Sequence, residues 1–243
     1  ELVEGEPLGG RIARGPVAEA STDPKAYERL VDRLLGSEPY QSRHAEHLAS
    51  LWLDAGRYAD TSGIHMDAGR QAWVYRDWLL RALRDDLPFD RFVTEQLAGD
   101  LLPGATVDQK VATGFLRNHV TTDEGGAIDE EYLVEYAAER TATVGSVFLG
   151  LTLGCARCHD HKYDPIRQQD YYQLFAFFRH NREPGLYSQV PDSNRALEPF
   201  LPVPTPEQQA EGERLRTAHT AAVKALATID PAEQAAFAAF TQE

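Results

Sequence analysis

Residues 128–154 (IDEEYLVEYAAERTATVGSVFLGLTLG) carry apolar side chains at helical spacing through most of their length. The repeat predicts one long helix, because apolar residues that recur every three or four positions share one helix face. Asp129 is suited to cap this helix, and Glu130 and Glu131 favour its first turn. The apolar face continues toward Cys155 and is formed by Leu133, Ala137, Val144, Val147, Phe148 and Leu151.

The rest of the chain predicts further helices and no series of strands. Thr106 and Gln109 have capping-box spacing, and Asp23 with Pro24 is typical of a helix start. Residues 1–20 read as an irregular arm, and residues 181–204, rich in proline, read as a loop. We therefore expect an all-α chain with a helical domain at 21–204 and an Ala-rich helical tail or linker at 205–243. The other expected helices cover residues 22–36, 42–59, 71–86, 90–99, 106–118 and 168–181.

The charge of the chain argues against two classes of partner. Its 243 residues carry a formal net charge of −14, so phosphate backbones and anionic membrane surfaces are repelled. The longest apolar stretch, residues 144–156, is too short and too rich in glycine to span a bilayer. No signal segment opens the sequence at Glu1, so we expect a fragment or a mature form.

Both cysteines of the chain lie in the stretch GLTLGCARCHDHKYDP, residues 150–165. Cys155, Cys158 and His159 form C-x-x-C-H, the haem attachment signature of c-type cytochromes. On a helical turn, positions 155, 158 and 159 share one face, so two thioether bonds can fix a haem c while the imidazole reaches its iron. The motif therefore predicts one covalent haem.

Other interpretations of the motif remain open. A thioredoxin-like C-x-x-C needs a βαβ context, which the sequence lacks. A zinc-stabilised structural or interaction domain could recruit Cys155, Cys158, His159 and His161, but four ligands within seven residues would struggle to surround an ion tetrahedrally. A disulfide between neighbouring cysteines, or two inert buried thiols, would be purely structural.

The sixth ligand of the iron decides what such a haem does. His159 is the expected proximal ligand, and the candidates for the opposite face are His119, then Met66, then His65, all in expected loops. A second strong ligand favours electron transfer, whereas an open site favours a haem enzyme of peroxidase or oxidase type. Arg157 and Lys162 are candidate partners of the haem propionates.

The acidic loop TTDEGGAIDEE, residues 121–131, is a candidate calcium site. Oxygen ligands and glycines suit a flexible calcium site. The loop lacks the regular spacing of an EF-hand, and acids that cap the long helix explain most of its composition.

Five stretches resemble, in order, the planctomycete-type cytochrome c domain family: residues 51–63, 75–103, 113–136, 149–165 and 170–178. The resemblance covers roughly residues 24–180. It implies a haem-bearing module of a large, extracytoplasmic protein, with Cys155, Cys158 and His159 as the attachment residues. One position departs from the family pattern, since Arg167 stands where we expect a Ser that could cap the following helix.

The motif and the resemblance together predict a multi-helix domain that wraps one haem c. We expect it to transfer electrons to a redox partner protein or a neighbouring domain, in the periplasm or at the cell surface. The haem enzyme with an open distal site and the zinc-stabilised domain are the alternatives.

Overall fold

The computed structural model describes residues 24–64, 67–187 and 198–227, together with residues 235, 237 and 239. The described part is helical and contains no strand beyond three isolated bridges, which confirms the all-α class. The chain divides into two compact units, Glu1–Phe200 and Leu201–Glu243. The domain boundaries expected at 20/21 and 204/205 stay predictions.

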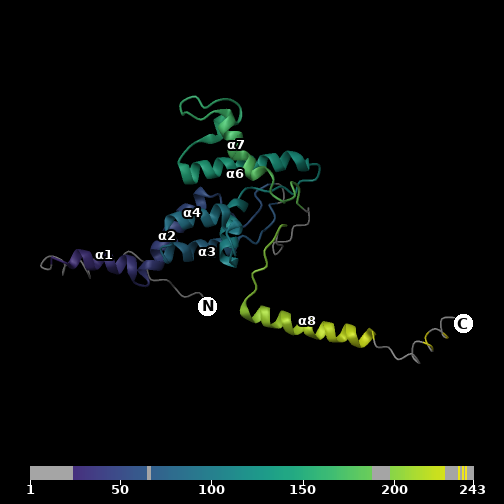
Figure 1. The fold of residues 1–243 in the computed structure, drawn as a ribbon. Coiled ribbons are helices and arrows are strands. Elements are labelled where there is room, and N and C mark those ends of the chain that lie inside the picture. The colour runs from purple at the N-terminus through teal and green to yellow at the C-terminus, as the bar shows by residue number, and fades with distance from the viewer. Residues whose placement is uncertain are drawn as a thin grey trace. The chain divides into compact units, whose positions relative to one another are not determined.

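The first unit is built from seven α-helices with three short 3₁₀ helices between them (Figure 1). The second unit holds α8, which begins with a capping box between Thr205 and Gln208. The elements are α1 (Ala26–Gly36), α2 (Tyr40–Ala55), α3 (Trp73–Arg84), α4 (Phe89–Ala98), η1 (Gly99–Leu101), α5 (Val107–Ala112), η2 (Thr113–Arg117), α6 (Asp129–Leu149), η3 (Leu153–Arg157), α7 (Gln168–Arg179) and α8 (Pro206–Ala227).

The long helix α6 lies between two groups of elements. In Figure 1, α7 lies over one side of α6, and α2, α3 and α4 lie on the other. The main core fills the space among α2 to α6, and Leu79, Ala112 and Ala137 are fully buried in it. Trp52 packs edge-on against Phe92 and Phe148, with ring centroids 4.9 and 5.5 Å apart. Helices α2 to α6 thus bury apolar residues against one another, whereas α1 buries none of its residues.

Several helix ends differ from the sequence expectation. The helix expected at 106–118 has the predicted Thr106–Gln109 capping box but changes to a 3₁₀ helix at Thr113. The cap expected from Asp129 is wrong, because its Oδ1 accepts hydrogen bonds from the Gly185 and Leu186 N–H groups instead. Gly150, in the left-handed region at φ 64°, ends α6 five residues before the first cysteine. Asp23, the expected cap of α1, lies outside the described residues.

Candidate functional site

The C-x-x-C-H residues lie on a tight helical turn that begins in η3. We call residues 155–159 the attachment turn, after their sequence motif. The carbonyl of Cys155 accepts hydrogen bonds from the N–H groups of Cys158 (3.3 Å) and His159 (3.4 Å). These are the i+3 and i+4 bonds of a helical turn, so the three residues share one side, as their spacing predicts. Both thiols are free and exposed, which contradicts the interpretation as inert buried or disulfide-linked cysteines.

The residues between and before the cysteines anchor this turn to the fold. Leu153 and Ala156 are buried against Tyr171 of α7. Leu153 also rests on Gly145 of α6, where a Cβ would come within 2.5 Å of its side chain. Only glycine permits this approach, so Gly145 sets how closely η3 lies on α6.

Helix α7 holds the turn from a second direction. The Gln168 Nε2 and the Tyr172 hydroxyl both donate to the Arg157 carbonyl, at 3.1 and 3.0 Å. The Asp160 Oδ1 in turn accepts the N–H of Gln168 (2.8 Å), the first residue of α7. The backbone on both sides of Cys158 and His159 is therefore fixed by hydrogen bonds.

The imidazole of His159 is exposed and held in one orientation. Its Nδ1 lies 2.7 Å from the Asp160 carbonyl. A carbonyl only accepts, so in the neutral ring Nδ1 carries the proton and Nε2 carries the free lone pair. Nε2 makes no hydrogen bond to a described residue, so this ring can donate to a metal through Nε2.

The second histidine of the motif has a different role. The His161 Nδ1 accepts hydrogen bonds from the N–H groups of Tyr163 (3.3 Å) and Asp164 (2.9 Å), so it organises the turn after His159. That lone pair is not available to a metal. Within the described residues, no group of three or more His, Cys, Asp or Glu side chains is arranged to hold a metal ion. The geometry therefore gives no support to a zinc site made from this motif.

The two basic residues expected near haem propionates lie on the same turn. Arg157 forms a two-pronged ion pair with Glu135 of α6, with N–O distances of 2.9 and 2.5 Å. Its hydrogen bonds to Glu135 raise the pKa of the guanidinium and lower that of the carboxyl group. Lys162 lies over the ring of Tyr163, 5.1 Å from its centroid. The propionate role of both residues stays a prediction.

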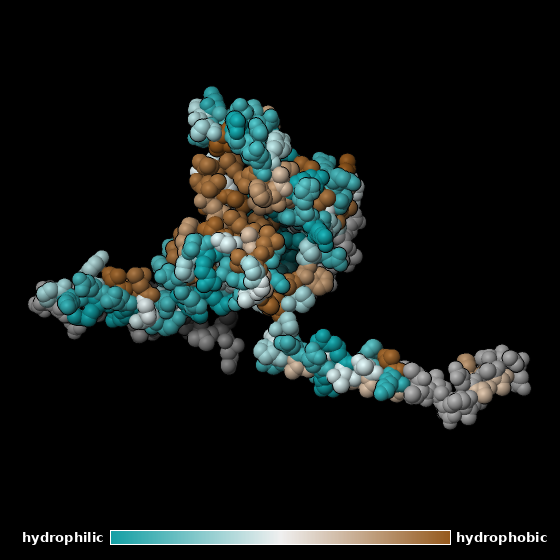
Figure 2. All heavy atoms as spheres, viewed as in Figure 1, coloured by the Kyte–Doolittle hydropathy of each residue, from teal (hydrophilic) through white to brown (hydrophobic). Residues whose placement is uncertain are grey.

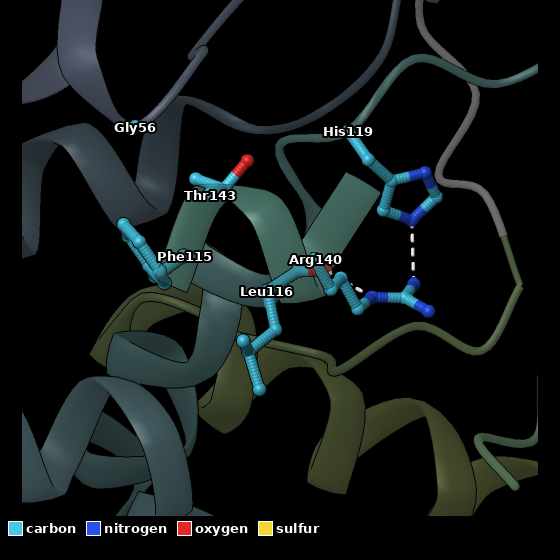
Figure 3. A pocket seen from close by; sticks show the side chains of 6 residues that line it. All are labelled: Gly56, Phe115, Leu116, His119, Arg140 and Thr143. Carbon is cyan, nitrogen blue, oxygen red and sulfur yellow. Dashed lines mark hydrogen bonds between the residues drawn. The ribbon is translucent and has the colours of Figure 1, made fainter. Parts of the chain in front are cut away.

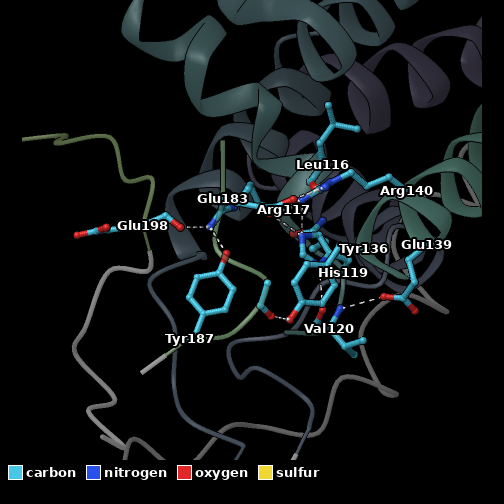
Figure 4. A network of polar contacts seen from close by, with 12 residues as sticks. Leu116, Arg117, His119, Val120, Tyr136, Glu139, Arg140, Glu183, Tyr187 and Glu198 are labelled. Carbon is cyan, nitrogen blue, oxygen red and sulfur yellow. Dashed lines mark hydrogen bonds and ion pairs between the residues drawn. The ribbon is translucent and has the colours of Figure 1, made fainter. Parts of the chain in front are cut away.

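His119, the first candidate for the distal ligand, lies in a buried polar network (Figure 4). Its Nδ1 bonds the Val120 carbonyl (2.8 Å), and its Nε2 accepts from Arg140 (2.5 Å), which also pairs with Glu183. Burial, opposed only in part by Glu183, lowers the pKa of His119 to about 4, so the ring is neutral. The hydrogen bonds and charge of Arg140 lower the pKa of Glu183 in spite of its burial.

This network and the attachment turn lie on opposite sides of α6. The network contacts Tyr136 and Arg140, and the attachment turn contacts Gly145. Tyr136 and Gly145 are separated by about two and a half helical turns, so the two positions face opposite sides of the helix. The structure thus brings His119 together with Arg140 and Glu183, and it does not bring His119 to Cys155 or His159. Met66 and His65, the other distal candidates, lie outside the described residues.

A small pocket borders the same network (Figure 3). Its volume is about 10 Å³, roughly the room that one water needs. A haem does not fit there, so the helical envelope that we expected around a haem stays a prediction. The pocket is lined by Gly56, Phe115, Leu116, His119, Arg140 and Thr143.

Sequence reasoning missed the buried charges of this region. Arg140, Glu183 and Arg70 are embedded, and Arg70 donates to the backbone carbonyls of residues 117, 118 and 119. Nothing in the spacing of these residues signals that they meet, because 43 positions separate Arg140 from Glu183. The prolines of residues 181–204 predict a loop, and nothing in that stretch predicts that Glu183 is buried.

A protein-family model matches residues 16–183 and therefore most of the chain. The model is PSCyt2, described as a protein of unknown function (DUF1549). No curated protein and no solved structure matches the chain. Among the described residues, every helix is too short or too polar to cross a membrane. The matched span includes the attachment turn, α6 and α7, and the chain thus belongs to the planctomycete cytochrome c-like domain family.

Proposed function

We propose that this chain is a c-type cytochrome domain, with one haem bound covalently through Cys155 and Cys158, that transfers electrons within a larger exported protein. The observation that carries the proposal is the attachment turn, with two exposed free thiols and an oriented imidazole on one side. Each thiol can add across one vinyl group of the porphyrin, forming a thioether with no change in electron count. The family match supports the proposal at the level of a cytochrome c-like domain.

The protein groups at this turn suit an axial ligand. The Asp160 carbonyl holds the Nδ1 proton, which makes Nε2 the basic nitrogen and fixes the plane of the ring. Hydrogen bonds from α7 to the Arg157 carbonyl keep the backbone from shifting when a ligand binds. When bound, the haem would supply a one-electron redox centre whose potential depends on its axial ligands and its exposure.

The surface beside the turn provides apolar contacts for such a group. Figure 2 shows hydrophobic residues gathered between α7 and the layer of α2 and α4, next to α6. These helices carry exposed apolar side chains that include Leu51, Leu149 and Phe177. Large exposed apolar patches often mark interaction surfaces or ligand-binding sites. A haem laid on this surface would gain the contacts that the small pocket cannot give.

The exposure of the site favours electron transfer over catalysis. A haem peroxidase or oxidase needs a cavity that excludes water and admits one substrate. The cavity described above lies on the other side of α6 and has room for about one water. A haem attached at a surface turn would instead leave an edge that a partner domain can approach, and electron transfer requires only that approach.

The experiment is to produce the chain together with the cytochrome c maturation machinery and to denature it. Thioether bonds survive unfolding, so the haem spectrum should remain with the denatured polypeptide. Cys155→Ala or Cys158→Ala should leave one thioether, and the double variant should leave none. His44→Gln is the control, because this histidine is exposed on α2, outside the C-x-x-C-H turn, and should not affect attachment.

Purified protein that holds zinc and no haem after competent maturation would overturn the proposal. Carbon monoxide and cyanide then separate the two haem functions. Ready binding of both, with turnover of peroxide, would favour the enzyme, whereas a six-coordinate spectrum that resists both ligands would favour electron transfer.

A further inference from the structure

The fully buried side-chain atoms without a hydrogen-bond partner gather in one region of the described chain. They are the Ser62 Oγ, the Asn118 Nδ2, the Thr121 Oγ1 and both carboxylate oxygens of Asp123. The two segments that carry them are paired, because the Thr121 N–H donates to the Ser62 carbonyl (2.9 Å). Buried polar atoms in native proteins are almost always partnered, so a group of them together indicates a missing species.

Asp123 is the one ionisable residue among these unpartnered groups. It is 3 % exposed, and no described residue forms an ion pair with it. A buried carboxylate without a partner is costly, since it loses its hydration and gains no compensating charge. A water molecule could satisfy a hydroxyl, but it would leave the negative charge uncompensated. The group that completes this region is therefore expected to carry positive charge.

The local backbone directs several oxygens to the same region. Thr121 and Thr122 are extended and lie between two neighbours, Gly63 on one side and Leu186 on the other. Side chains two positions apart on an extended segment leave it on the same side, so the side chains of Thr121 and Asp123 are expected to leave the chain on one side. The chain then turns over residues 124–127, closed by a hydrogen bond from Ala127 N–H to the Glu124 carbonyl (3.1 Å).

We propose that Asp123, with the hydroxyl of Thr121 and nearby oxygens, binds a calcium ion. The donors are a carboxylate and hydroxyls, which are hard oxygen ligands and suit Ca²⁺. Transition metals prefer imidazole or thiolate, and neither is among these unpartnered groups. The Asn118 amide can join through its oxygen, because the two ends of an amide are assigned and not observed.

The ligand charge sets the expected strength of binding. One carboxylate contributes far less than the several acids of an EF-hand, so the site belongs with the weak, roughly millimolar class found in extracellular modules. The site does not depend on the proposed haem, because Asp123 lies in the loop before α6 and the attachment turn follows α6. Each can therefore fail without the other.

The test is calcium-dependent stability of the full chain after treatment with a chelator. We expect the melting temperature to rise by roughly 3–5 °C at about ten times the dissociation constant, and to keep rising with the logarithm of the Ca²⁺ concentration above it. Mg²⁺ should give a smaller shift, because it demands near-ideal octahedral geometry. Asp123→Asn should abolish the Ca²⁺ shift and, in chelator, should melt above the wild type, because it removes an uncompensated buried charge.

Glu46→Gln is the control, since it removes a charge from an exposed position of α2, outside residues 121–131, and should keep the Ca²⁺ shift. Calorimetric titration of the wild type and Asp123→Asn with Ca²⁺ measures binding directly. No calcium-dependent shift in the wild type would overturn the proposal, as would an equal shift in Asp123→Asn.

Discussion

Acidification should weaken the fold through the buried histidine His119. The neutral ring donates from Nδ1 to the Val120 carbonyl and accepts from Arg140 at Nε2. A proton on Nε2 would point at the Arg140 guanidinium and break that hydrogen bond. Burial is the main reason that the pKa of His119 falls from 6.5 to about 4.

The pH dependence of the free energy of unfolding follows from the difference between the pKa values of His119 in the folded and unfolded chains. The unfolded chain binds a proton near pH 6.5, whereas the folded chain resists it until about pH 4. The stabilisation is therefore complete above pH 6.5 and is lost as the pH falls from 6.5 to 4. The total amounts to roughly 3 kcal/mol, of which about 2 kcal/mol is lost between about pH 7 and pH 5.

Denaturant unfolding at the two pH values measures this loss. Tryptophan fluorescence reports on the first unit, because Trp52, Trp73 and Trp78 all lie in it. His119→Gln removes the titrating group but keeps an amide oxygen that can accept from Arg140. The wild type should lose about 2 kcal/mol more than His119→Gln between these pH values, and His44→Gln, at an exposed position of α2, should behave as the wild type. Equal losses in the wild type and His119→Gln would refute the reasoning.

Two substitutions test other parts of the same fold. Glu183→Ala leaves Arg140 buried without its carboxylate, so the free energy of unfolding should fall by about 3–5 kcal/mol in denaturant titrations; a loss no greater than that of an exposed Glu→Ala would contradict the burial of the pair. Gly145→Ala places a Cβ within 2.5 Å of the Leu153 side chain, so it should cost about 1–3 kcal/mol and lower the yield of covalent haem. Unchanged stability and haem yield would show that η3 does not rest on α6 in this way.

The helices could be predicted from the sequence because their signals are local. The apolar repeat of residues 128–154 places α6 correctly, and the Thr106–Gln109 spacing gives the observed cap. The exact ends could not be predicted, because they depend on distant partners. Asp129 has the sequence of a cap, yet two backbone N–H groups beyond position 184 bind its carboxylate instead.

The shared side of Cys155, Cys158 and His159 could be predicted for a similar reason, since it follows from one helical turn, and their attachment of a haem stays a prediction. The positions of the distal candidates could not be predicted, because they depend on which loops meet in space. The sequence predicts His119 in a loop, as a candidate distal ligand. Its contacts with Arg140 and Glu183 instead hold it on the side of α6 opposite to the motif. A buried arginine and a glutamate that are distant in sequence leave no pattern that periodicity can detect.

The departure at position 167 shows how a missing local signal can be replaced. Arg167 cannot accept a hydrogen bond as a Ser side chain would, yet α7 begins directly after it. Asp170 accepts the Arg167 N–H (2.9 Å), and the Asp160 carboxylate accepts the Gln168 N–H (2.8 Å). Asp160 also holds the His159 ring through its own carbonyl (2.7 Å). One residue thus fixes both the start of α7 and the orientation of the imidazole, so the position of the candidate ligand is coupled to the packing of α7 even though the ligand itself is exposed.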